Sequence, residues 1–218
     1  MDDPLDTYGT RFPPADRPAG ERLRRRAGDL AAGAAGAAIL VILLVAGMWA
    51  IEVADYVLPG DFDVYGIRSW DVEGLGGILL APFLHAGFGH LMANSLPLLV
   101  LGFLAALRGI GRFLLASLII VVVSGLGVWF TSSPYVVTVG ASGLVFGYFG
   151  FVVARGLFDR SALDIVIAVG VAVAYYSIIW GVLPGEAGIS WQGHLFGLVG
   201  GVLAAWAVRR RRRTLPAY

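Results

Sequence analysis

The stretch DLAAGAAGAAILVILLVAGMWAI, residues 29–51, decides the class of fold. It carries no charged side chain after its first residue. As a helix rising ~1.5 Å per residue, it is long enough to cross a bilayer core of ~30 Å. A cleaved signal peptide is the alternative, but the long polar leader before this stretch favours a retained helix. The sequence therefore predicts a membrane protein.

The composition of the whole chain supports this class. Hydrophobic residues make up 58% and charged residues 14%, and the mean hydropathy is +0.79, well outside the range of soluble globular domains. All basic residues are arginine, which excludes a lysine base or Schiff base. The chain has no cysteine, which excludes disulfides, thiolate catalysis and cysteine-ligated zinc.

Five further apolar stretches follow, at about residues 84–107, 113–130, 142–154, 163–180 and 191–208. Fifteen of the sixteen arginines lie in the two termini and in alternate connections, whereas the other connections hold only Arg68 among several acidic residues. The positive-inside rule then predicts an all-α bundle of six transmembrane helices with both termini cytoplasmic. Residues 1–28 are expected to be a disordered tail, residues 29–208 the membrane domain and residues 209–218 a basic tail.

Polar side chains are rare within the six stretches and therefore mark candidate functional positions. They are His85, His90, Asn94, Ser142, Gln192 and His194, and no carboxylate lies deep in any stretch. Counting back from the cytoplasmic arginines at ~1.5 Å per residue places Asn94, Ser142 and His194 at one level, about 10 Å below the outer edge of the bilayer core. The segment before Ser142 must then enter the membrane beside a cavity that opens outward.

Two stripes of small residues predict which helices approach each other. Glycines recur at Gly143, Gly147 and Gly150, and again at Gly193, Gly197 and Gly201. Such spacing lets two membrane helices pack closely, although it is also common in packing without chemistry. Because Ser142 and His194 each adjoin the first glycine of a stripe, close packing would bring a hydroxyl to an imidazole.

This pairing suits acyl transfer. A serine hydroxyl needs a base to become a nucleophile, and imidazole is such a base near neutral pH. The free backbone N–H groups at the helix start near Ser142, with the side chains of Asn94 and His90, are candidate donors to an oxyanion. With no carboxylate at this depth, a Ser-His pair is expected rather than a full triad.

At these residues the chain resembles the rhomboid family of intramembrane serine proteases. The resemblance rests on HAGFGHLMAN at residues 85–94, GASG at 140–143 and GHLFGLVGG at 193–201. It implies Ser142 as nucleophile, His194 as general base, and His90, Asn94 and the Ser142 N–H around the oxyanion, with Gly140 in the bordering loop. Many members have a tyrosine where this chain has Phe146, a ring expected to pack on His194, and many have a Trp-Arg pair where this chain has Arg68 and Trp70 in the reverse order.

The resemblance also implies partners and location. We expect transmembrane protein substrates, cleaved near the outer membrane interface beside small residues, and a bacterial plasma membrane with the active site opening outward. No cofactor, metal ion or nucleic-acid partner is expected, and the sequence does not specify an oligomeric state. The role of residues 52–83 is left open between an interfacial segment and a solvated loop.

Rival functions are a catalytically silent rhomboid-like protein that binds membrane clients, and a transporter or channel. Silent rhomboid-like proteins generally lack the serine or the histidine, whereas this chain has both. A transporter or channel would be expected to show inverted halves or a charged pathway, and this sequence shows neither. A metalloprotease needs His-Glu-x-x-His and an aspartyl protease needs two buried aspartates, and neither pattern is present.

Overall fold

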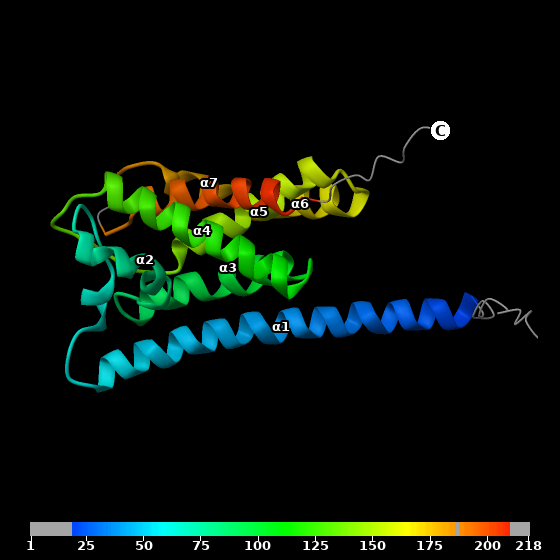
Figure 1. Cartoon of the computed structure of the whole chain (residues 1–218), viewed down its shortest axis with the longest axis horizontal. Coiled ribbons are helices and arrows are strands. Elements are labelled where there is room, and N and C mark those ends of the chain that lie inside the picture. Colours follow the sequence, from blue (N-terminus) through cyan, green and yellow to red (C-terminus); the bar gives the residue numbers. More distant parts are fainter. Residues whose placement is uncertain (1–18, 186–187, 210–218) are drawn as a thin grey trace, which may run out of the picture.

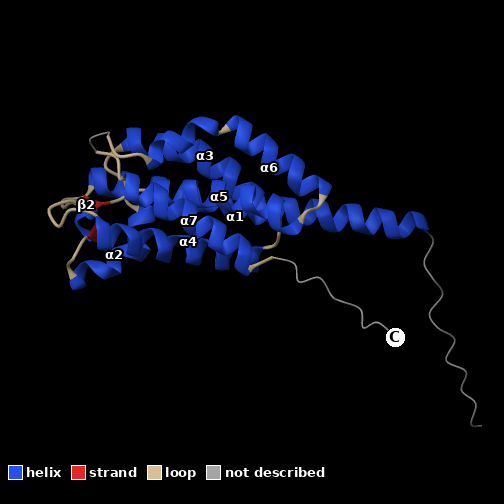
Figure 2. Ribbon diagram, turned by 90° about the horizontal axis from the view of Figure 1, so that it is seen from above, coloured by secondary structure: helices blue, strands red, loops and turns tan. Residues whose placement is uncertain are grey.

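The computed structural model describes residues 19–185 and 188–209, which form a helical bundle with two short strands at one end (Figures 1 and 2). The α-helices are α1 (Ala19–Val57), α2 (Gly77–Leu80), α3 (Phe88–Ala106), α4 (Ile110–Thr131), α5 (Ser142–Asp159), α6 (Ala162–Ala174) and α7 (Trp191–Ala207). The 3₁₀ segments are η1 (Phe62–Tyr65), η2 (Val72–Gly76), η3 (Ala81–Phe83) and η4 (Tyr176–Val182), and the strands are β1 (Ile67–Arg68) and β2 (Val137–Thr138). The expected all-α membrane fold is therefore confirmed.

Helix α1 has 39 residues and lies along one side of the bundle (Figure 1). It begins at Ala19 rather than at residue 29, so the expectation of a disordered tail is wrong for residues 19–28; residues 1–18 and 210–218 lie outside the described part of the chain. The reason is that Ala, Glu, Leu and Arg in this stretch are good helix formers despite their polarity. Val41 of α1 packs on α3, where a side chain added at Gly102 would meet it at 3.2 Å.

The centre of the bundle is α5. Its residues from Leu144 to Val152 are all buried, including Tyr148 and Phe151 at 0% exposure. A helix that is apolar on every face belongs in the interior, and α3, α4, α6 and α7 pack around it. The hydroxyl of Tyr148 finds a partner in Ser117 of α4, 2.7 Å away.

The fifth predicted helix, residues 163–180, is broken in the structure. Helix α6 ends at Ala174, and η4 continues at an angle of 66° to it. Tyr175 leaves the helical region at φ −115°, and the next turn closes with the tighter bond from Ile178 N–H to Tyr175 O, 3.0 Å. The helices long and apolar enough to cross a membrane are α1, α3 and α4, with the bent pair as a fourth span among the described residues.

Other helix ends also differ from the predicted ones. Helix α3 begins at Phe88 instead of residue 84, because Gly87 takes φ +99° and ends the preceding turn. His85 consequently lies in a loop before α3. Helix α5 continues five residues past 154, to Asp159.

Within the segment at residues 52–83, residues 52–57 continue α1, and residues 58–83 form a folded cap on one end of the bundle. Its strand β1 pairs antiparallel with β2, with Ile67 opposite Thr138. The Ser69 hydroxyl donates to Val128 O of α4 at 3.1 Å, and Trp70 packs on Trp129. These contacts tie the segment to α4 and to the chain just before α5, which a plain solvated loop would not do.

Candidate active site

The first turns of α5 and α7 bring Ser142 and His194 to the same region. A Cβ atom added at Gly197 would overlap the carbonyl oxygen of Gly143, and one at Gly201 would overlap that of Gly147. The two glycine stripes therefore make the close helix contact that the sequence predicted. Near the helix starts, a Cβ at Gly143 would lie 3.5 Å from the Gly193 carbonyl oxygen. The residue after Ser142 and the residue before His194 are therefore close neighbours.

The His194 ring is held on two sides. Its Nδ1 lies 2.8 Å from the carbonyl oxygen of Gly181 in η4, and the Phe146 ring stacks on it with centroids 4.0 Å apart and planes 9° apart. Because a carbonyl only accepts, Nδ1 must carry the proton in the neutral ring, and Nε2 keeps its lone pair. The predicted packing of Phe146 on His194 is present in the structure.

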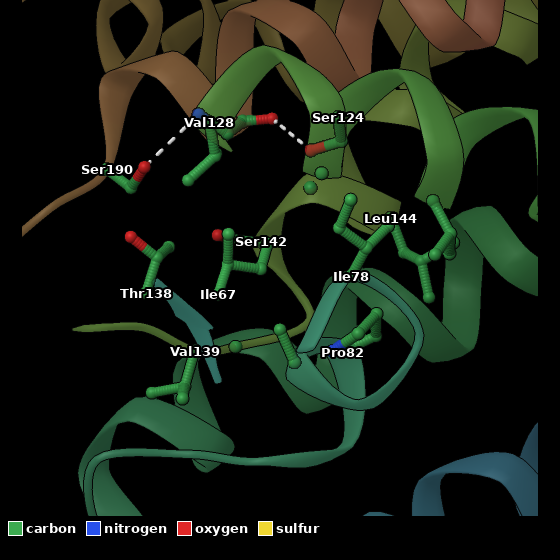
Figure 3. Close-up of a pocket in the computed structure, with 16 residues that line it drawn as sticks. Ile67, Ile78, Pro82, Ser124, Val128, Thr138, Val139, Ser142, Leu144 and Ser190 are labelled. Atoms are coloured by element: carbon green, nitrogen blue, oxygen red, sulfur yellow. Dashed lines mark hydrogen bonds between the residues drawn. The ribbon is translucent and has the colours of Figure 1, made fainter. Parts of the chain in front are cut away.

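Two serines fix the backbone next to His194. Ser190 caps α7 and accepts the Gly193 N–H at 3.2 Å, and the Ser124 hydroxyl of α4 donates to the Gly193 carbonyl at 2.9 Å (Figure 3). Sequence reasoning did not single out either residue. Ser124 could have been recognised as a candidate because its hydroxyl interrupts the apolar run of α4.

Ser142 lines a small cavity of about 30 Å³ beneath the cap segment (Figure 3). The walls combine small and apolar residues of β1, α2, α4 and α5 with the hydroxyls of Ser124, Thr138 and Ser190. Gln192 is half-buried and is not one of the lining residues. Within the described residues no hydrogen bond joins Ser142 to His194, and without substrate such bonds are often long or poorly aligned.

The loop before α5 needs glycine at position 140. Gly140 has φ +118°, which side chains rarely adopt, and a Cβ there would lie 2.5 Å from Cε1 of the His90 ring. Its N–H donates to the Ala81 carbonyl at 2.8 Å. The structure therefore places the His90 ring directly against the backbone two residues before Ser142.

Asn94 is buried on α3, one turn after His90. Its exposure is 6%, and its amide nitrogen donates to the His90 carbonyl at 3.0 Å. A side-chain amide carries two N–H groups, so one donor is used to hold the side chain against its own helix and the other is available.

His85 is buried at 1% exposure, and its Nε2 accepts the Ala141 N–H at 3.3 Å. It also contacts the His90 ring edge-on, at 5.2 Å between centroids. This gives His85 a structural role at the start of α5. In the described part of the chain no group of three or more His, Cys, Asp or Glu residues could hold a metal ion.

Fold and site together define an integral membrane protein with a serine and a histidine on two closely packed helices. The Rhomboid domain profile matches residues 73–211. An uncharacterized protein of Mycobacterium tuberculosis is 44% identical over 186 residues, covering 80% of this chain and 78% of its own length; one of Mycobacterium leprae is 39% identical over 188 residues, covering 81% and 74%. "Putative rhomboid protease YdcA" of Bacillus subtilis is 32% identical over 143 residues, covering 62% and 69%. The chain belongs to the rhomboid family.

Proposed function

We propose that this chain is an intramembrane serine endopeptidase that cleaves transmembrane proteins near the outer membrane interface. Ser142 is the nucleophile and His194 the general base. The observation that carries the proposal is the bond from His194 Nδ1 to Gly181 O, because it leaves Nε2 unprotonated on a ring stacked beside the start of α5. The backbone carbonyl does part of what an aspartate does in a triad: it fixes the tautomer and orients the ring.

Three groups are proposed to donate hydrogen bonds to the oxyanion that forms when Ser142 attacks the substrate carbonyl. The Ser142 N–H lies in the first turn of α5, where backbone donors are free and the helix dipole favours negative charge. The second amide hydrogen of Asn94 and the ring of His90 supply the side-chain donors. The Ala141 N–H already donates to His85 Nε2, so it is not one of the donors to the oxyanion.

The cavity beside Ser142 suits a small side chain of the substrate. Its apolar wall of Ile67, Ile78 and Val128 excludes charge, and Gly140 and Gly143 let substrate backbone approach closely. The substrates are therefore expected to be membrane-spanning proteins with small residues at the cleaved bond, since rhomboid relatives act on membrane-embedded proteins.

The direct test of this function is covalent labelling. A fluorophosphonate probe reacts with an activated serine, so the purified full chain should be labelled and Ser142→Ala should not be. Ser133→Ala, which removes an exposed serine after α4, is the matched control and should label like the wild type. A wild-type chain that stays unlabelled while folded would favour the catalytically silent, client-binding alternative.

We further propose six spans with both termini in the cytoplasm of a bacterium, and the site opening to the outer side of the plasma membrane. The chain has no native cysteine, so single cysteines can report the sidedness of each loop. Gly76 and Gly111 are both exposed, with nothing within 4 Å of an added Cβ. An impermeant thiol reagent added to intact cells should label Gly76→Cys and leave Gly111→Cys unlabelled until the cells are opened; the reverse pattern would contradict this topology.

The contact between Gly181 and His194 gives a third prediction. A Cβ at Gly181 would lie 2.7 Å from Cζ of Phe146 and 3.2 Å from His194 Nδ1. Gly181→Ala should therefore displace the stacked rings and lower kcat by about 10–100-fold, the range of a lost orienting contact. Initial rates on a reconstituted transmembrane substrate measure this, at matched melting temperature. Gly170→Ala in α6, where an added Cβ meets nothing within 4 Å, should leave the rate unchanged, and equal rates for both variants would refute the orienting role.

A further inference from the structure

Four arginines gather at the end of the bundle opposite Ser142. Arg108 follows α3, Arg112 lies in the first turn of α4, Arg155 lies on α5 and Arg209 follows α7. They line a shallow cleft, together with Phe151, Asp159, Ala205 and Val208. Ser142 is the first residue of α5 and Arg155 is near its end, so this cleft is separate from the proposed protease site.

Two of the arginines are neutralised inside the protein. Asp164 of α6 pairs with Arg108, and with Arg155 Nη2 at 3.1 Å, and Asp159 lies 3.6 Å from Arg108 Nη2. Within the described residues no carboxylate pairs with Arg112 or Arg209. The cleft therefore carries more positive than negative charge.

Arg155 offers a donor that the protein does not use. The residue is 4% exposed, and its Nε is buried without a hydrogen-bond partner. Its Nη atoms engage Asp164 and, more weakly, the Leu104 carbonyl at 3.5 Å. A buried N–H without an acceptor destabilises the protein, so Arg155 leaves an unmet demand for a hydrogen-bond acceptor beside the cleft.

We propose that the cleft binds the phosphate group of an anionic phospholipid in the membrane leaflet at this end. Guanidinium groups present planar pairs of donors that match phosphate oxygens, and basic pockets between membrane helices bind anionic head groups. Trp206 is 54% exposed and its ring lies 5.0 Å from the Arg209 guanidinium, an arrangement typical of the membrane interface. Leu107 and Ile110, beside two of the arginines, are 40% and 50% exposed, which provides an apolar surface for acyl chains and favours a lipid over free phosphate.

The test is a lipid titration of the purified full chain in neutral detergent, followed by native mass spectrometry. Dioleoylphosphatidylglycerol should bind more tightly than dioleoylphosphatidylcholine. Arg112→Gln and Arg209→Gln should each weaken the phosphatidylglycerol complex by about fivefold, the usual effect of one arginine near an anionic lipid. These two positions are chosen because neither takes part in the Asp164 ion pairs, so the fold should persist.

Arg160→Gln is the matched control, because it removes an exposed arginine at the same end of the bundle that does not line the cleft. It should leave the affinity for phosphatidylglycerol nearly unchanged. Equal weakening by all three variants would overturn the proposal in favour of general surface attraction, as would the absence of any preference for phosphatidylglycerol. Displacement of the lipid by millimolar inorganic phosphate, with the same dependence on Arg112, would overturn the lipid assignment and identify free phosphate as the ligand. None of these measurements depends on protease activity.

Discussion

Cleavage of a reconstituted transmembrane substrate is expected to fall by on the order of 10⁴-fold or more when either Ser142 or His194 is replaced by alanine. The hydroxyl is a weak nucleophile without the imidazole, and the imidazole has nothing to activate without the hydroxyl. Initial rates in detergent, at matched expression and melting temperature, measure the loss.

The double variant distinguishes a joint role from two separate ones. Since the two side chains act as one unit, Ser142→Ala with His194→Ala should be no slower than either single variant. Losses that multiplied would show independent contributions and contradict the shared proton transfer. Wild-type cleavage by Ser142→Ala would refute the protease proposal entirely.

Asn94→Ala is expected to lower kcat by on the order of 10²–10³-fold with little change in KM. The reason is that the Asn94 amide is proposed to stabilise charge that exists only in the transition state, while Ser142, His194 and the remaining donors stay in place. The variant should still react with a fluorophosphonate probe, more slowly than the wild type.

The control for Asn94 is Met92→Ala on the same helix, whose side chain is 62% exposed; it should retain wild-type kinetics. If Asn94→Ala raised KM and left kcat unchanged, Asn94 would bind substrate in its ground state and the oxyanion role would be wrong. Because Asn94 Nδ2 donates to the His90 carbonyl, the melting temperature of the variant must be compared as well.

The sequence was informative about the site wherever a polar side chain interrupts an apolar helix. Ser142, His194, His90 and Asn94 are conspicuous for that reason, and the glycine stripes predicted which helices meet. The resemblance to the rhomboid family predicted that the Phe146 ring packs on His194, and the i,i+4 spacing of Ser142 and Phe146 on one helix face agrees with this. These are properties of side chains at helical spacing, which a sequence states directly.

The acceptor for His194 Nδ1 could not be predicted in the same way. It is a backbone carbonyl, which every residue has, and it reaches the ring because the chain bends by 66° between α6 and η4. The pairing of β1 with β2 and the bond from Ala141 to His85 likewise depend on tertiary contacts between distant segments. The helical start of α1 at Ala19 does not follow from polarity, because the helix propensity of Ala, Glu, Leu and Arg outweighs it.

Because Nδ1 of His194 is hydrogen-bonded to Gly181 of η4, the state of the His194 ring depends on the position of η4. No residue of η4 is buried, and Ile179 and Trp180 are 52% and 68% exposed. If η4 moves outward, Nδ1 loses its acceptor and the ring is free to take either tautomer. The ratio of the two His194 tautomers, measured from the imidazole nitrogen resonances by NMR, would therefore show whether η4 is packed against His194 or displaced from it. This measurement requires no substrate turnover.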